Sequence, residues 1–291
     1  EFEGGFVLTQ AGLTFRGQRR YSCDRLHGII DREMEYTSAS LASLPIPRQH
    51  RSLKRVVGVN GTKPSCAVVG NSGSLWDGLD GKRIDRADIV IRHNLAPVGG
   101  VYAQAVGSKT TVWVVNAYHL NAVPEQGPVV LVMPAHTPAV LNDQIKGDGG
   151  SHARIRAMYE RGVYFLSPEI LCTAAEAAKL PLDKEYGPRP STGIVGVLIG
   201  LAACGSIDVY GFDYSTLRLA DRPLTPQRHG THYWDNEAAS ATTHAFADEL
   251  DFMANEPRIR LHPTPAPRPK PGERRARHST ATAAAQLLQR S

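Results

Sequence analysis

The sequence predicts an α/β fold in which a mostly parallel central sheet is flanked by helices. Short runs rich in Val and Ile, as expected of parallel strands buried on both faces, alternate with segments of helical periodicity. Such alternation is typical of strands joined by crossover helices. The strand-like runs are Cys66–Val69, Ile89–Ile91, Thr111–Val115, Val129–Met133, Val163–Leu166 and Ile207–Tyr210, and the helical patterns include Ala153–Glu160, Ala174–Lys179 and Ile194–Ala203.

The first two strands each lead into an asparagine. The run Cys66–Val69 passes into a polar glycine turn that contains Asn71, and the run Asp88–Arg92 passes into His93-Asn94. Ligands of open α/β sheets bind outside the carboxyl ends of the strands, so both asparagines are expected at a ligand site. A glycine turn after a strand also suits a phosphate group. Turn formation alone would explain the same residues.

Two more polar positions precede helical patterns. Ser191-Thr192-Gly193 stands directly before the apolar run Ile194–Ala203, where hydroxyl and backbone N–H groups would either attract an anion or simply cap the helix. His244 stands before a second helical pattern, marked by Phe246, Leu250 and Met253. A histidine there is either a surface or capping residue or a base, because imidazole titrates near neutral pH.

The net charge of +5 is concentrated at the end of the chain. Residues 258–291 carry eight Lys and Arg against one acid, and the remainder has a net charge of −2. A basic stripe for nucleic acid is therefore not expected on the folded body. The longest apolar run, Ile194–Cys204, is about half of the roughly 20 residues that a membrane-spanning helix needs.

The chain divides into three regions. Residues 1–55 form an N-terminal extension that is expected to pack as a helical cap, and residues 56–262 carry all of the motifs. Residues 263–291 form a basic tail rich in Pro and Ala, which reads as a solvated extension. Within the central region, the Pro- and Gly-rich segment 215–230 lacks periodicity and is expected to be a mobile loop beside the ligand site.

Four motifs follow one another between residues 64 and 250. The first comprises Cys66–Gly73, Ile84-Asp85, Asp88, Arg92, Asn94, Ala96-Pro97, Gly100 and Val106–Thr111; the second Pro190–Gly193, Cys204 and Val209–Phe212; the third His232–Asp235; and the fourth His244 with Glu249. In this order they resemble the long, short, third and very short sialylmotifs of the animal-type sialyltransferases, glycosyltransferase family 29. The resemblance covers about two thirds of the chain.

The resemblance implies a Rossmann-like variant of the GT-A fold and an activity. Residues 56–262 would be a catalytic domain that moves a sialic acid from its CMP-linked donor to a sugar hydroxyl, with inversion. His244 would be the general base. His232 would reach the phosphate of the nucleotide, where a donor imidazole stabilises the charge of the leaving group. The glycan acceptor is not identified by the motifs, a galactose-terminated glycan being one candidate.

Other residues take roles by the same resemblance. Glu249 is expected to support the site or orient a neighbour, and its alternative is a charge on the helix surface. Asp235 stands where the family usually has a glutamate, so its supporting role carries over with a shorter side chain. The residues implied in binding the CMP-sugar are Asn71, Ser72, Asn94, Ser191, Thr192, Gly193, Gly211, Phe212, Tyr233 and Trp234.

The four cysteines allow three pairings. The resemblance implies a disulfide between Cys66 and Cys204 that ties the first motif to the second; the alternative is two buried thiols. The pairing of Cys23 and Cys172 stays open. Family members are usually type II membrane proteins of the secretory pathway, so the chain is expected to be a catalytic fragment of the Golgi lumen without its anchor. The sequon Asn60-Gly61-Thr62 is compatible with that compartment.

No cofactor or metal is expected. The sequence has no Cys/His cluster with zinc spacing and no Asp-x-Asp of the kind that holds a divalent ion in other glycosyltransferases. A CMP-linked sugar leaves as a monophosphate ester, whose charge histidine and helix-terminal N–H groups can stabilise. A nucleoside diphosphate often needs a metal. The sequence therefore favours a CMP donor and a metal-independent reaction.

Three alternatives remain. A member of the same family could transfer a related 2-keto-3-deoxy acid, Kdo or Kdn, because the motifs recognise the CMP and the carboxylate. A nicotinamide oxidoreductase built on Gly70–Gly73 would use Asp85 or Asp88 to contact a ribose, and would leave both histidine motifs unexplained. A catalytically silent lectin-like member would lack the base, whereas His244 is present.

Overall fold

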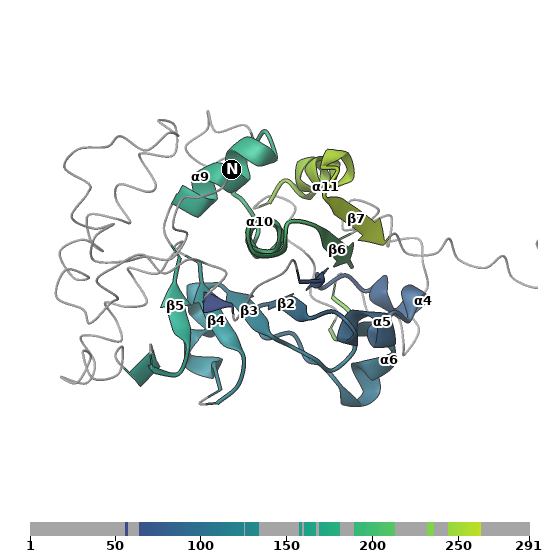
Figure 1. The fold of residues 1–291 in the computed structure, drawn as a ribbon, viewed down its shortest axis with the longest axis vertical. Helices are drawn as coiled ribbons and strands as arrows, with labels where there is room; N and C mark the ends of the chain where they lie inside the picture. The colour runs from purple at the N-terminus through teal and green to yellow at the C-terminus, as the bar shows by residue number, and fades with distance from the viewer. Residues whose placement is uncertain are drawn as a thin grey trace, which may run out of the picture.

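The computed structural model describes residues 56–57, 64–124, 126–133, 157–158, 160–166, 169–180, 189–212, 232–235 and 244–262. The expected helical cap, the loop at 215–230, the tail at 263–291 and most of the helical pattern Ala153–Glu160 lie outside these ranges. Within them, the α/β fold expected from the sequence is confirmed (Figure 1).

A seven-stranded sheet forms the centre, in the order β5-β4-β3-β2-β1-β6-β7, and every pairing is parallel. Six strands were predicted within one or two residues. The seventh strand was not predicted, because it is not an apolar run: it lies at the edge of the sheet and contains the exposed Arg260. The strands are β1 Cys66–Val69, β2 Ile89–His93, β3 Val112–Val115, β4 Val129–Val132, β5 Val163–Phe165, β6 Ile207–Tyr210 and β7 Ile259–His262.

Helices cover both faces of the sheet (Figure 1). The helices α4 (Leu75–Gly78), α5 (Gly81–Asp85) and α6 (Ala103–Val106), preceded by the 3-10 turn η2 (Gly100–Tyr102), lie on one face. On the other face lie α9 (Glu169–Ala177), α10 (Thr192–Cys204) and α11 (Phe246–Asn255), and the 3-10 helix η3 (Ala117–Ala122) follows β3. The sheet is thus buried on both sides, which is why its strands are Val- and Ile-rich.

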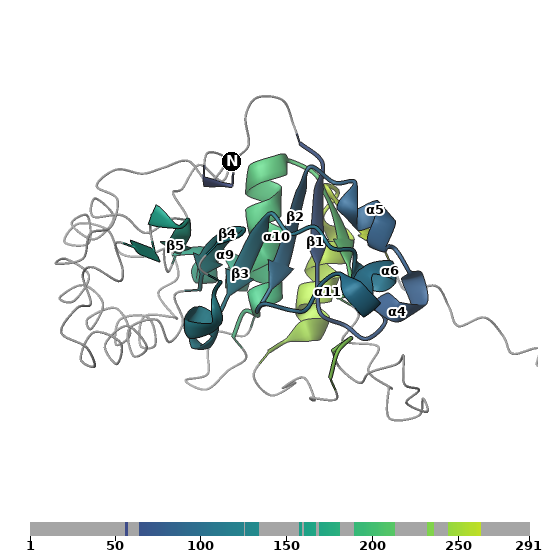
Figure 2. The ribbon, with the colours of Figure 1, turned by 90° about the horizontal axis from the view of Figure 1, so that it is seen from below.

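Alternate residues of each strand contribute to two separate cores. In β1, Cys66 and Val68 pack in the cluster that surrounds α10, whereas Ala67 and Val69 pack with side chains of α4, α5 and α6. Most residues of α10 are buried, because it contacts β1, β2, β3 and β6 on one side and α9 on another. Figure 2 shows α10 running along the sheet beside β1 and β2.

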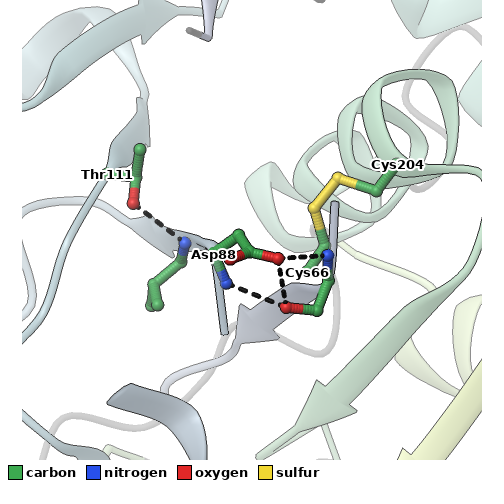
Figure 3. The surroundings of a disulfide bond; sticks show 6 residues. Cys66, Asp88, Thr111 and Cys204 are labelled. Carbon is green, nitrogen blue, oxygen red and sulfur yellow. Dashed lines mark hydrogen bonds between the residues drawn. A yellow bond between two sulfur atoms is a disulfide. The ribbon is translucent and has the colours of Figure 1, made fainter. Parts of the chain in front are cut away.

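A disulfide joins Cys66, the first residue of β1, to Cys204, the last residue of α10 (Figure 3). This pairing was implied by the resemblance and is confirmed. Because the bond joins the start of the strand to the end of the helix, α10 runs antiparallel to β1 and its first turn lies at the carboxyl edge of the sheet. Cys172 is also disulfide-bonded, and Cys23 lies outside the described residues.

Helix lengths bear on membrane insertion. Among the described helices, not one is both long and apolar enough to cross a membrane.

Candidate active site

The direction of the strand order reverses between β1 and β6, and the glycine turns of the two motifs meet there. The backbone N–H of Gly70 donates to the carbonyl of Tyr210, at 2.8 Å, and that of Ser72 donates to the carbonyl of Gly211, at 3.2 Å. A Cβ on Gly70 would collide with the backbone of Gly211, which itself has a φ of +68°. Both turns therefore require glycine, and the reversal opens the crevice in which ligands of such sheets bind.

The asparagines expected at this edge lie there, and a third accompanies them. Asn71 follows β1 and is buried, and Asn94 follows β2 in a left-handed conformation, with φ of +49°. The side-chain oxygen of Asn94 accepts from the backbone N–H of Asn116, at 3.0 Å. Asn116 follows β3, and its own Oδ1 is buried without a hydrogen-bond partner. Sequence reasoning missed Asn116, although the same pattern of a strand followed by asparagine marks it.

The first turn of α10 is held by a carboxylate. Ser191 caps the helix by accepting from the backbone N–H of Ile194, at 3.2 Å. Glu249 of α11 is only 1% exposed and accepts twice from Ser191, from its N–H at 2.7 Å and from its hydroxyl at 2.6 Å. Burial raises the pKa of Glu249 to about 7, against the opposing effect of these two bonds. The hydroxyl of Ser191, expected on the donor, is thus already engaged.

Two backbone groups of that turn remain available. Thr192 and Gly193 are half-buried, and their N–H groups have no hydrogen-bond acceptor among the described residues. These are the N–H groups that a helix N-terminus leaves unsatisfied and that attract anions. The ring of Phe212 packs so closely on Gly193 that a Cβ there would lie 2.7 Å from a ring carbon. The first turn of α10 therefore lies beside the turn that follows β6.

His244 stands at the same helix terminus. It precedes α11, and its Nδ1 lies 2.9 Å from the carbonyl oxygen of Arg189. Because a carbonyl only accepts, Nδ1 carries the hydrogen and the lone pair of the neutral ring is on Nε2. Burial lowers the pKa of His244, against the raising effect of the bond to Arg189. A neutral imidazole with an available Nε2 is suited to accept a proton.

His232 lies over the turn after β1. Its backbone forms an antiparallel bridge with Ser72. Its Nδ1 lies 3.0 Å from the Oδ1 of Asp235, and its ring stacks on Trp234 with centroids 4.5 Å apart and planes 4° from parallel. The third motif thus joins the first at the carboxyl edge of the sheet.

Tyr233 and Phe212 are core residues in this structure. Tyr233 is 1% exposed, its hydroxyl donates to the carbonyl of Pro97, and its carbonyl accepts from the indole N–H of Trp76. Phe212 is 5% exposed and packs edge-on against His93. The resemblance implies donor binding for both, and that role stays a prediction; in this structure their side chains pack in the walls of the site.

His93 is a buried neutral histidine at the end of β2. Its Nδ1 donates to the carbonyl of Val69, at 2.9 Å, and its Nε2 is buried against Gly196 of α10 without a hydrogen-bond partner. Burial lowers the pKa of His93 to about 4. The side chain thereby joins the carboxyl ends of β1 and β2 to the second turn of α10. Sequence reasoning named His93 only as the neighbour of Asn94.

Charged residues of the first motif fix the loop before β3. Asp85 accepts from the N–H groups of Ser108 and Lys109 and from the hydroxyl of Ser108, at 2.9–3.0 Å. Arg92, 1% exposed, donates to the carbonyls of Val106 and Lys109. Burial lowers the pKa of Arg92 to about 10, so it remains charged at neutral pH. These contacts position backbone and place no charge in the crevice.

The acids available to a nicotinamide site lie elsewhere. Asp88 precedes β2 and bonds the N–H and hydroxyl of Ser65, at 2.8 and 2.7 Å (Figure 3). Asp85 ends α5, also before β2, and is occupied by the loop at Ser108. Both therefore lie at the amino end of the parallel strands, whereas a ribose would lie at the carboxyl end. This placement argues against the oxidoreductase alternative.

In the described part of the chain, no group of three or more His, Cys, Asp or Glu side chains is arranged to hold a metal ion. Charged and hydrogen-bonding groups of other kinds converge at the carboxyl edge. They are the imidazoles of His232 and His244, the carboxylate of Asp235 beside His232, the carboxylate of Glu249 on Ser191, amide side chains and helix-terminal N–H groups.

Comparison with known proteins shows the family of the chain. Residues 17–255 match the family described as glycosyltransferase family 29 (sialyltransferase). CMP-N-acetylneuraminate-beta-galactosamide-alpha-2,3-sialyltransferase 1 of Sus scrofa is 30% identical over 194 residues, 65% of this chain and 53% of the relative. Alpha-N-acetylneuraminide alpha-2,8-sialyltransferase of Xenopus laevis is 26% identical over 251 residues, 80% of this chain and 67% of the relative. The chain spans about half the length of the alpha-2,3 relatives that it matches.

Solved structures share the fold. The crystal structure of a mammalian sialyltransferase in complex with Gal-beta-1-3GalNAc-ortho-nitrophenol aligns with a TM-score of 0.53 and 22% identity, covering 89% of this chain and 90% of that one. A second crystal structure of a mammalian sialyltransferase aligns equally well, at 23% identity.

Proposed function

Since the chain belongs to glycosyltransferase family 29, we propose that it transfers a sialic acid from a CMP-linked donor to a hydroxyl group of a glycan. The observation that carries this proposal is that residues from all four motifs converge at the carboxyl edge of the sheet. Among the described residues, Nε2 of His244 and the N–H groups of Thr192 and Gly193 have no hydrogen-bond partner, and these groups lie at the same end of α10. His232 lies over the neighbouring turn after β1.

The proposed reaction is a direct displacement with inversion. The acceptor hydroxyl attacks C2 of the sialic acid while His244 takes the proton of that hydroxyl on Nε2. The bond from C2 to the phosphate oxygen breaks, and its electron pair leaves with CMP. The N–H groups at the N-terminus of α10 and the imidazole of His232 stabilise the negative charge that develops. Asn71, Ser72 and Asn94 would bind the rest of the donor.

The reaction is proposed to need no metal ion and no cofactor. His232 and the N–H groups at the N-terminus of α10 supply positive or hydrogen-bonding groups for a monophosphate leaving group. The described part of the chain offers no cluster of metal ligands. Transfer rates are therefore expected to be equal after exhaustive treatment with EDTA and after addition of Mn²⁺ or Mg²⁺. A strict requirement for either ion would overturn this part of the proposal.

The donor sugar and the acceptor are resolved by one set of assays. CMP-sialic acid, CMP-Kdn and CMP-Kdo would be compared with galactose-terminated and sialic-acid-terminated glycans, since the relatives named above act on these two acceptor types. We expect transfer from CMP-sialic acid, with His244→Ala as the inactive control. Preferred transfer from CMP-Kdo or CMP-Kdn would show that this sugar, and not sialic acid, is the one transferred. Absence of transfer with all three would contradict the proposed function.

The proposed compartment is the lumen of the secretory pathway. The disulfide between Cys66 and Cys204 suits an oxidising environment. In this proposal the chain contains the catalytic part of a Golgi enzyme.

A further inference from the structure

We propose that Asp235 is a positioning residue for His232, which it holds so that Nε2 is the ring nitrogen left for the phosphate of the donor. The inference rests on the proposed function and adds a role to it. It starts from a difference between the two histidines of the site. His244 has the carbonyl of Arg189 at its Nδ1, whereas His232 has the carboxylate of Asp235 there.

The ring of His232 is held by more than this one bond. Asp235 lies three residues further along the chain, with Oδ1 at 3.0 Å from Nδ1. Trp234 stacks on the ring face at 4.5 Å. The backbone is fixed by the bridge of His232 to Ser72 and by Tyr233, whose N–H donates to the carbonyl of Asn71, at 3.0 Å. The imidazole is thus fixed relative to the turn that follows β1.

The partner of Nδ1 determines what Nε2 can do. An ionised carboxylate only accepts, so Nδ1 must carry the hydrogen. Nε2 then has a lone pair in the neutral ring and an N–H in the imidazolium, whose positive charge the neighbouring Asp235 balances. The two side chains are 24% and 30% exposed, so solvent screens their attraction. Asp235 therefore acts on the orientation and tautomer of His232 rather than through the energy of an ion pair.

In the transfer step, the imidazolium Nε2–H would donate a hydrogen bond to the phosphate oxygen that receives the electron pair of the breaking bond. No proton has to leave His232, because the proton of the acceptor hydroxyl goes to His244. The different partners of Nδ1 in the two histidines fit these two roles, a base and a hydrogen-bond donor. Burial lowers the pKa of His244 and favours the neutral base, against the raising effect of the bond to Arg189, and a carboxylate gives His232 a compensating charge when it donates.

The test measures the tautomer and the kinetics separately. Histidine labelled with ¹⁵N would be followed by NMR in the free protein, at a pH where His232 is neutral, in the wild type and in Asp235→Asn, Asp235→Ala and Asp235→Glu. Asp251→Asn, an exposed acid on α11, is the matched control. kcat and KM would then be measured for the CMP-linked donor.

We expect the Nδ1–H tautomer in the wild type, in the control, in Asp235→Glu and in Asp235→Asn, whose amide oxygen still accepts, and a shift toward Nε2–H in Asp235→Ala. The kcat of Asp235→Asn and Asp235→Ala should fall by about 10- to 100-fold, with the KM for the donor nearly unchanged, because both lack the carboxylate that compensates the imidazolium. An unchanged tautomer in Asp235→Ala, or an unchanged kcat in both variants, would overturn the proposal. If the wild type transfers no CMP-linked sugar, the proposed function fails, and the tautomer comparison still decides whether Asp235 positions His232.

Discussion

Glu249 and Ser191, 58 positions apart in the sequence, are joined by two hydrogen bonds through which the very short motif holds the N-cap of α10. Both residues are buried, and the pair lies beside the N–H groups of Thr192 and Gly193, which have no hydrogen-bond acceptor in the described part of the chain. The contact makes the position of the helix terminus depend on α11. The carboxylate also follows His244 closely in the chain, because His244 directly precedes the N-cap of α11 and Glu249 lies in the first turn of this helix.

Replacing Glu249 should therefore destabilise the protein. Glu249→Ala removes the acceptor of two buried donors, and we expect a loss of roughly 1–3 kcal/mol in the free energy of unfolding, measured by urea denaturation. Glu249→Gln keeps one acceptor and should lose less. If Glu249→Ala unfolds at the same urea concentration as the wild type, the clamp contributes nothing to stability.

Glu249 also predicts a pH dependence. Its pKa is raised from 4.5 to about 7 in the folded protein, so the unfolded chain releases this proton first as the pH rises. The contribution of this residue to stability is thus full below about pH 4.5 and is lost as the pH rises through about 7. Glu249→Gln should remove this part of the dependence of the unfolding free energy on pH. A pH profile identical to that of the wild type would contradict the prediction.

His93 predicts a pH dependence of opposite sign. Its pKa is lowered to about 4 by burial, so the unfolded chain binds the proton first as the pH falls. Stability is full above about pH 6.5 and decreases toward pH 4, by about 3 kcal/mol for a shift of this size. His93→Asn keeps an N–H donor for the carbonyl of Val69 but does not titrate. This variant should lose less stability between pH 6.5 and 4 than the wild type, and an equal loss would assign the effect to other groups.

Removal of the imidazole at His244 should abolish most of the transfer. We expect His244→Ala to lower kcat by about 10²–10⁴-fold if the residue is the general base, while the affinity for CMP, measured by calorimetry, stays within a few-fold. Because burial lowers the pKa of His244, the acidic limb of the rate profile in the wild type should lie below pH 6.5. Near-normal turnover in the variant would refute the assignment.

The disulfide joins the amino end of β1 to the carboxyl end of α10, across 138 positions of the sequence. Its loss, in Cys66→Ser/Cys204→Ser, should lower the free energy of unfolding by roughly 2–5 kcal/mol, because the unfolded chain gains freedom. Donor affinity should fall with it, since the bond fixes the helix relative to the strand that carries Asn71. Labelling of both cysteines by a thiol reagent in the unfolded, non-reduced wild type would contradict the pairing.

Much of the site could be predicted from short stretches of sequence. Cys66–Val69 and Ile207–Tyr210 read as buried parallel strands because both of their faces must be apolar, and the turns after them must therefore lie at one edge. Ser191 was recognisable as an N-cap from the helical run behind it. These predictions follow from local burial and backbone hydrogen bonding. The resemblance of the motifs to known sialylmotifs then indicated the family.

The partners of the functional side chains depended on tertiary structure. The sequence predicted a supporting role for Glu249 but not that Ser191 is the residue it holds, and it did not show that the ring of Tyr233 lies in the core. His93 and Asn116 acquire their significance only from what packs around them. By itself the sequence determined which segments are buried and which turns face one edge. Which polar atoms meet there was decided by how α10 and α11 pack on the sheet, because residues far apart in the chain come within hydrogen-bonding distance only after that packing.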